Sequence, residues 1–168
     1  MKLKTTEKGF TLLEVLVTLA ILGAIMGVMS AAVIVIMKTS SQNNEWNVNI
    51  RQVQNAGHWI SQDALMAQVV TTDSPGVFLA LSWCDWNGND NVVQYFFDGN
   101  TLKRQLNGGA AILIAEYVVH DTTPTSPTIC NWNDDDKKLT VKIRASLHGS
   151  RYAERTYEIF PRPVARGG

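Results

Sequence analysis

One acidic residue, Glu14, stands at the start of a long apolar segment. Residues 15–37 carry no charged side chain, and roughly 20 such residues suffice for a helix to cross the hydrocarbon core of a membrane. A carboxylate in such a segment is costly and normally has a partner or a function. In a bundle of apolar helices, the N-terminal amine of a neighbouring chain would neutralise Glu14 and fix the axial register, because a slip would leave two unpaired charges. The alternative is that Glu14 reaches the lipid headgroups.

Three interpretations of this N-terminus compete. A secretory signal uses roughly 7 to 15 apolar residues, which is fewer than the segment contains. A plain signal anchor, with its N-terminus held in the cytoplasm by Lys2, Lys4 and Lys8, explains every feature except Glu14. The third interpretation is cleavage after Gly9, which keeps the apolar helix and leaves a new N-terminus. We favour the third.

The residues around that point resemble a known processing signature. They read Gly9-Phe10-Thr11-Leu12-Leu13-Glu14-Val15 and are similar to the prepilin signature of type IV pilins and type II secretion pseudopilins. The resemblance implies that a prepilin peptidase in the inner membrane cuts between Gly9 and Phe10 and methylates the new amino group of Phe10. It also implies that Glu14, fifth in the mature chain, guides assembly with other pilin or pseudopilin subunits.

Cys84 and Cys130 are the only cysteines, an even number in a domain expected to face an oxidising compartment. The sequence predicts a disulfide between them, closing a loop of about 45 residues and worth ~3 to 4 kcal/mol in the loop-entropy model. Two unpaired thiols are the alternative. Neither cysteine belongs to a Cys-x-x-Cys motif, and the three histidines show no metal-ligand spacing.

Each cysteine begins a similar polar segment of seven residues, 84–90 and 130–136. Oxygen ligands at alternate positions resemble half of a calcium loop, first in Asp85, Asn87 and Asn89 and again in Asn131, Asn133 and Asp135. The other half is missing, because Asp90 and Phe96 stand where such a loop needs Gly and Glu. Turn chemistry is the usual explanation for such runs. These residues are therefore only weak calcium candidates, and we expect no cofactor.

The same segments each contain a tryptophan, Trp86 and Trp132. These side chains form either a small exposed aromatic patch at a subunit or ligand interface or a contact between the two loops. The sequence leaves both possibilities open.

The apolar segment is expected to continue as a longer helix. The polar stretch at residues 39–44 resembles a break but contains neither Gly nor Pro, so we expect the helix to continue through it with a weak point there. Beyond it, apolar and small residues recur at spacings of four and three along one helical face: Trp46, Ile50, Val53, Gly57, Ile60, Ala64 and Ala67. That face must pack on a sheet. The sequence predicts a transmembrane or filament-core helix at residues 10–37 and an amphipathic continuation at 38–72, ended by Thr72-Asp73-Ser74-Pro75-Gly76.

From residue 77 the pattern changes to strands rich in Val, Ile, Tyr and Phe. Strands are predicted at residues 77–83, 92–97, 101–106, 111–120, 138–145 and 152–160, with a Pro-rich loop around Pro124 and Pro127. Asp98-Gly99-Asn100 predicts a tight hairpin at the heart of the sheet. The last hairpin turns at His148-Gly149-Ser150, and its alternating pattern predicts one solvated face. The head domain would span residues 77–162, with a tail at 163–168.

A long helix followed by antiparallel strands is an α+β layer arrangement, which agrees with the pilin fold that the resemblance implies. A second, broader resemblance is to J-type minor pseudopilins and related minor pilins. It rests on residues 54–67 with Trp59-Ile60-Ser61-Gln62-Asp63 at their centre, and on Val93-Gln94-Tyr95, Leu102-Lys103-Arg104 and Ala115-Glu116-Tyr117-Val118. Many major pilins carry a proline midway along the apolar helix, and residues 10–37 contain none, which favours a low-copy subunit.

Charge and motifs limit the function classes. Removing a leader of residues 1–9 takes three basic residues and one acidic residue from 15 of each, leaving 12 basic and 14 acidic residues and a net charge of about −2. Nothing in that balance favours nucleic acid, and no local motif suggests a hydrolase or another enzyme.

We therefore expect a non-enzymatic minor pilin or pseudopilin with a single pass through the inner membrane. Its N-terminus would lie in the cytoplasm and its head outside, later in a periplasmic or cell-surface filament. Within the family, the alternative is a pilus subunit whose head binds DNA or a surface. Outside it, the alternative is a membrane-anchored extracytoplasmic binding or sensing domain with an uncleaved signal anchor.

Overall fold

The computed structural model describes residues 9, 11–120, 128–149 and 151–162 of the chain. One long helix precedes a series of strands, which confirms the predicted α+β arrangement. The elements are α1 (Leu12–Met66), β1 (Val69–Ser74), β2 (Val77–Cys84), β3 (Asp90–Asp98), β4 (Thr101–Leu106), β5 (Ile112–Ala115), β6 (Ile129–Asn133), β7 (Lys138–Ala145) and β8 (Ala153–Ile159). The chain divides into two compact units, Met1–Asn43 and Asn44–Gly168, which are described separately; the second is called the head.

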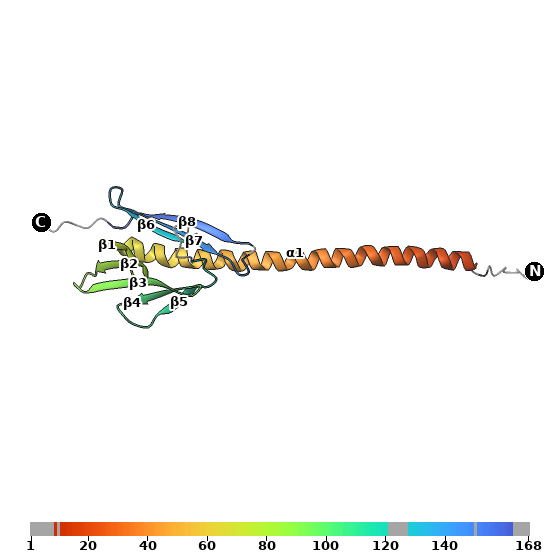
Figure 1. Cartoon of the computed structure of the whole chain (residues 1–168), viewed down its shortest axis with the longest axis horizontal. Helices are drawn as coiled ribbons and strands as arrows, with labels where there is room; N and C mark the ends of the chain where they lie inside the picture. Colours follow the sequence, from red (N-terminus) through yellow and green to blue (C-terminus); the bar gives the residue numbers. More distant parts are fainter. Residues whose placement is uncertain (1–8, 10, 121–127, 150, 163–168) are drawn as a thin grey trace, which may run out of the picture. The chain divides into compact units, whose positions relative to one another are not determined.

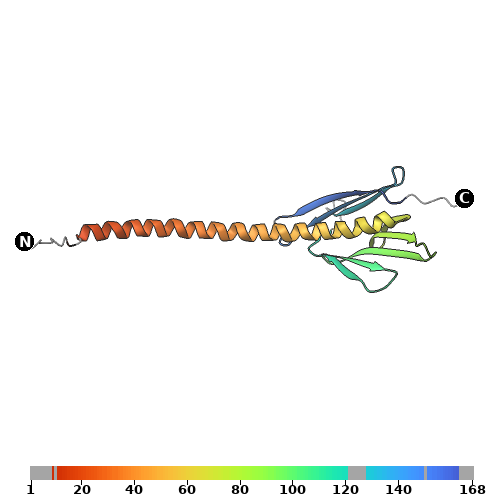
Figure 2. The same ribbon diagram turned by 180° about the vertical axis from the view of Figure 1, so that it is seen from behind.

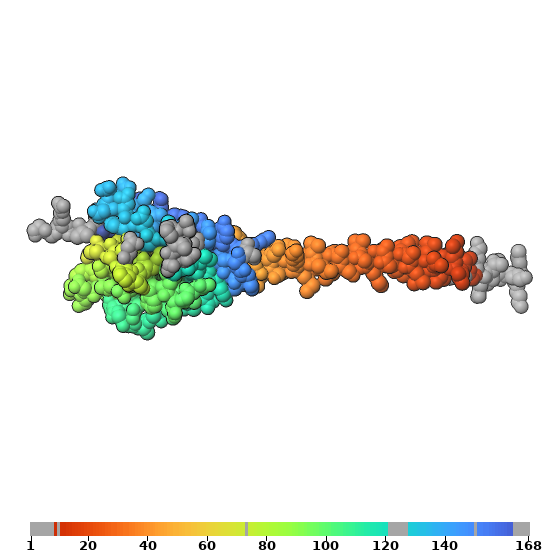
Figure 3. Space-filling view, viewed as in Figure 1, coloured from red at the N-terminus to blue at the C-terminus, as the bar shows by residue number. Residues whose placement is uncertain are grey.

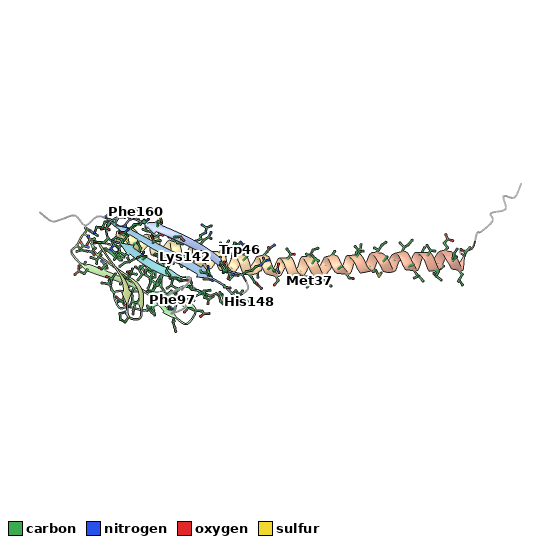
Figure 4. All side chains as sticks on the ribbon, turned by 45° about the horizontal axis from the view of Figure 1, so that its top comes forward. Met37, Trp46, Phe97, Lys142, His148 and Phe160 are labelled. Atoms are coloured by element: carbon green, nitrogen blue, oxygen red, sulfur yellow. The ribbon has the colours of Figure 1, made fainter. Side chains whose placement is uncertain are left out.

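The first unit contains the apolar part of α1. The helix begins after Thr11, whose Oγ1 accepts a hydrogen bond from the backbone N–H of Glu14 at 3.3 Å, the geometry of an N-cap. It continues as α-helix through the polar stretch at residues 39–44, as the sequence predicts. Side chains project from every side of the helix around Met37 (Figure 4).

The head consists of two antiparallel sheets with the second part of α1 between them (Figures 1 and 2). One sheet has five strands in the order β1-β2-β3-β4-β5, and the other has three in the order β6-β7-β8. The sequence predicts antiparallel strands but does not divide them between two sheets. Because a sheet lies on each side, α1 buries two faces instead of one.

The face predicted to pack is buried for most of its length, from Val53 to Ala67, whereas Trp46 at its start is 42% exposed. A second buried set was missed: Asn49, Ala56 and Asp63. Polar residues on a helix normally indicate a solvent face. Here Asp63 accepts hydrogen bonds from β3 and β4, and Asn49 bonds to the backbone of the connection between β7 and β8.

Two strands lie where the sequence predicts helix or loop. The helix ends at Met66, before the predicted end at 72, and β1 follows at once. Val69, Val70, Thr71 and Thr72 are β-branched, and this favours a strand over a helix. Pro75 and Gly76 therefore turn a hairpin into β2, with Gly76 at φ 76°. The second missed strand is β6, in a stretch read as loop; Pro124 and Pro127 lie outside the described residues.

The predicted hairpins are confirmed. Asp98 pairs with Thr101 across Gly99 and Asn100, and β3 occupies the centre of the five-stranded sheet. In β7 every second residue is buried, and β7 pairs with β8 throughout its length. The outer face of this pair is ionic, because Lys142 and Arg144 both bind Glu154. The strand predicted at 111–120 is shorter, Ile112–Ala115, and Val118 forms only an isolated bridge to Ala145. Ser150 of the predicted last turn lies outside the described residues.

Candidate functional site

Glu14 lies in the first turn of α1 and is exposed. Its backbone N–H donates to the carbonyl oxygen of Thr11 at 3.0 Å as well as to the Thr11 hydroxyl. A carboxylate in the first turn is favourable beside the positive end of the helix dipole. Among the described residues it takes part in no ion pair.

The predicted processing site is only partly described. Gly9 is exposed, and a Cβ at that position would meet nothing within 4 Å. Phe10, the predicted methylated residue, lies outside the described residues. The position of the cut rests on the sequence.

The rest of the apolar segment has no internal partner. Every residue described between 11 and 37 is exposed, and the helix contains a window long and apolar enough to cross a membrane, with mean hydropathy 2.6 and no burial. Gly23 and Gly27 lie four residues apart, on one side of the helix, and a Cβ on either would meet nothing within 4 Å. Small residues at this spacing let a second helix approach closely. The segment needs lipid or other helices around it.

The decisive comparison concerns this segment. Residues 4–36 match the family model described as the prokaryotic N-terminal methylation motif. The match includes Gly9, Phe10 and Glu14 and lies wholly outside the head. No curated protein and no solved structure matches the chain.

The chain therefore carries a pilin-type signature followed by a membrane-anchoring helix. Such a signature implies processing by a prepilin peptidase and assembly with other pilins.

No bond joins Cys84 to Cys130 in the structure. Cys84 is exposed at the end of β2 in the five-stranded sheet, whereas Cys130 is half-buried in β6 of the three-stranded sheet. The disulfide stays a prediction of the sequence.

In the first calcium candidate, the Asp85 carboxylate is already hydrogen-bonded within its own loop. The Asp85 carboxylate accepts hydrogen bonds from the N–H of Asn87 and of Asn89, both at 2.9 Å, and from the Asn89 amide at 3.1 Å. These bonds, led by that from the Asn89 backbone, lower the pKa of Asp85. Turn formation thus accounts for these side chains.

The second segment behaves in the same way, because Asn133 Oδ1 accepts from the N–H of Asp135 at 2.9 Å and of Asp136 at 3.3 Å. In the part of the chain that the structure describes, no three His, Cys, Asp or Glu residues are placed to hold a metal ion.

The two tryptophans differ in environment. Trp86 is 94% exposed on its turn, whereas Trp132 is half-buried and packs against the core. The sequence shows the similarity of the two segments but not this difference, because burial of Trp132 depends on strands far away in the chain.

Proposed function

We propose that the protein is a minor pilin or pseudopilin, a non-enzymatic subunit that prepilin peptidase cuts between Gly9 and Phe10. It then enters a type IV pilus-like or type II secretion filament through α1. The observation that carries the proposal is the match of residues 4–36 to the methylation motif. The matched residues include an exposed apolar helix, in which Glu14 is the one charged residue before Lys38.

Glu14 is proposed to bind the methylated N-terminal amine of Phe10 in a neighbouring subunit. An unpaired carboxylate inside an apolar bundle is strongly unfavourable, whereas an ion pair there is tolerated when its geometry is good. One such pair per added subunit sets the register of each helix against the last. The open side of α1 at Gly23 and Gly27 supports close packing of the helices.

A minor rather than major role is supported by the absence of proline from residues 10–37. The broad resemblance of the head to J-type minor pseudopilins points the same way. In this role the head lies at or near the filament tip and contacts other minor subunits or cargo.

The experiment that tests this pairing removes the charge of Glu14 and leaves the cleavage site between Gly9 and Phe10 unchanged. We expect Glu14→Val to be processed nearly normally and to remain in the membrane, while its amount in the filament fraction falls on the order of tenfold or more. Glu14→Asp is the matched control, because it retains the carboxylate and should retain most incorporation. The two variants are compared by immunoblotting membrane and sheared-filament fractions. Normal incorporation of the valine variant would contradict the pairing.

A further inference from the structure

A small groove lies in the head between α1 and the edge strand β8. Its volume is about 200 Å³, and we define it as the β8 groove by its lining residues, which are Trp46, Ile50, Val53, Ala153, Glu154 and Arg155. Figure 4 places Trp46 at one end of the head and Phe160 at the other. In Figure 3 the blue surface of the β7–β8 hairpin borders α1 at the Trp46 end.

The wall that α1 contributes is apolar and only partly covered. Val53 is buried and Ile50 is half-buried, whereas Trp46 is 42% exposed. Trp46 lies on the helical face that is buried in the core from Val53 onwards, so the exposed part of its ring extends the core out to the surface. A tryptophan in this position presents an apolar ring and an N–H donor together, which suits a boundary between an apolar phase and water.

The wall that β8 contributes is positively charged. Glu154 is neutralised by two cations, Lys142 Nζ at 3.1 Å and the Arg144 guanidinium at 2.6 Å. Arg155 is exposed and takes part in no ion pair among the described residues. Three cations therefore accompany the one carboxylate of the lining. A guanidinium in this position suits a phosphate group, because its planar fork of donors matches two phosphate oxygens.

The head is tied to the membrane-anchoring part of α1 by a short length of chain. Trp46 follows Met37, the last residue of the uncharged segment, by nine residues. Nine residues span at most roughly 32 Å even when fully extended, so this length bounds the distance from Trp46 to the lipid headgroups. Anionic headgroups attract Arg and Lys near the bilayer surface, and tryptophan rings favour the headgroup level. The groove thus carries the chemistry of a site for anionic lipid within reach of the membrane.

We propose that the β8 groove binds the headgroup of an anionic phospholipid in the membrane that α1 anchors. The phosphate oxygens accept hydrogen bonds from the Arg155 guanidinium, and the glycerol backbone packs against Trp46 and Ile50. The volume suits a headgroup, because clefts that enclose a whole drug-sized ligand measure roughly 300 to 1000 Å³. The inference goes beyond the assembly role of α1, since it concerns the head and the membrane surface.

The test measures contact between the head and lipid headgroups in the full chain, reconstituted in bilayer nanodiscs. One set of discs contains phosphatidylcholine alone, and the other contains equal parts of phosphatidylcholine and phosphatidylglycerol. Both carry a trace of phospholipid with a nitroxide on its headgroup, which quenches the emission of nearby tryptophans. We expect stronger quenching in the anionic discs. Trp46→Phe should abolish this difference, whereas Trp86→Phe, which removes a tryptophan that is 94% exposed, should preserve it.

The charge is tested by neutralising one cation at a time. Arg155→Gln should lower the ratio of quenched to unquenched Trp46 emission in the anionic discs by roughly fivefold, because one cation near an anionic surface is lost. Arg155→Lys should retain part of the effect, since it keeps the charge but not the planar fork. Lys137→Gln is the matched control. It removes an exposed cation from the β6–β7 turn, outside the groove, and should leave the ratio unchanged.

The proposal is overturned if the two kinds of disc quench equally, which is the result expected if the groove instead takes a segment of a partner protein. It is also overturned if Trp46→Phe keeps the difference or if Arg155→Gln behaves as the wild type does. Equal losses for Arg155→Gln and Lys137→Gln would contradict it as well, because the charge of the whole head rather than the groove would then act. None of these measurements requires processing or assembly, so their failure would leave the filament role intact.

Discussion

Asp63 and Arg104 form a two-pronged ion pair that joins α1 to β4. Arg104 Nε lies 2.7 Å from Asp63 Oδ2, and its second terminal nitrogen lies 2.9 Å from Oδ1. Asp63 is 3% exposed, and the hydroxyl of Tyr95 also donates to its Oδ2. The hydrogen bond to Asp63 raises the pKa of Arg104, whose guanidinium lies 5.1 Å from the ring centre of Trp59. This cluster fixes the helix against the five-stranded sheet.

Removing one partner of this pair should destabilise the head strongly. Asp63→Ala leaves the partly buried Arg104 charge without its counterion and the buried Tyr95 hydroxyl without its acceptor, and we expect a loss of roughly 3 kcal/mol in the free energy of unfolding. The double variant Asp63→Leu, Arg104→Leu should lose less than that single variant, because it buries no unpaired charge. Urea unfolding of the full chain in detergent measures both.

The matched control for that experiment is Asp98→Ala, which breaks the exposed Asp98–Lys103 pair at 2.5 Å. Solvent screens exposed pairs, so this variant should lose little stability. Equal losses for Asp63→Ala and Asp98→Ala would show that the buried pair does not hold the helix in place.

Tyr95 makes stability depend on alkaline pH. Burial, followed by the hydrogen bond to Asp63, raises the pKa of Tyr95 above its usual value of about 10. Because the folded state holds this proton more tightly than the unfolded chain does, the stabilisation is fully present below pH ~10 and is lost as pH rises through the folded-state pKa. Between these limits, wild type should lose up to ~1.4 kcal/mol per pH unit more than Tyr95→Phe. Parallel pH profiles for both proteins above pH ~10 would contradict this assignment.

Gly57 is a point of close approach between α1 and β8. A Cβ at Gly57 would overlap the ring of Tyr157, whose hydroxyl donates to the carbonyl of Val53 at 3.2 Å. Gly57→Ala should therefore destabilise the head by ~1 to 3 kcal/mol through overpacking, although alanine favours helix. Adding Tyr157→Val should remove most of the penalty of the alanine. If Gly57→Ala stabilises the protein in thermal unfolding, the close approach is not as described.

The features that the sequence predicts well are those encoded by neighbouring residues. The apolar helix, the β3–β4 hairpin around Gly99 and the alternation in β7 each have a local periodicity or turn chemistry. Glu14 and Gly9 belong to a short motif, so sequence alone identifies them as candidates.

The features that the sequence does not predict depend on distant segments. Division into two sheets and burial of Asp63 both arise when strands far apart in the chain pack around α1. A usable signal for the ion pair was present: Asp63 lies on a helical face beside Ile60 and Ala64, and Arg104 is flanked along β4 by Leu102 and Leu106. Two opposite charges within apolar patterns indicate a buried pair. Cysteine spacing likewise gives no sign that Cys84 and Cys130 belong to different sheets.

The central claim is that the chain follows the prepilin pathway, and the state of its N-terminus tests this most directly. Protein extracted from membranes of cells containing prepilin peptidase would be examined by intact mass measurement and N-terminal sequencing. The account predicts a chain that lacks residues 1–9 and begins with N-methylated Phe10. A chain that retains residues 1–9 would contradict it and would leave α1 as an uncleaved anchor for an extracytoplasmic domain.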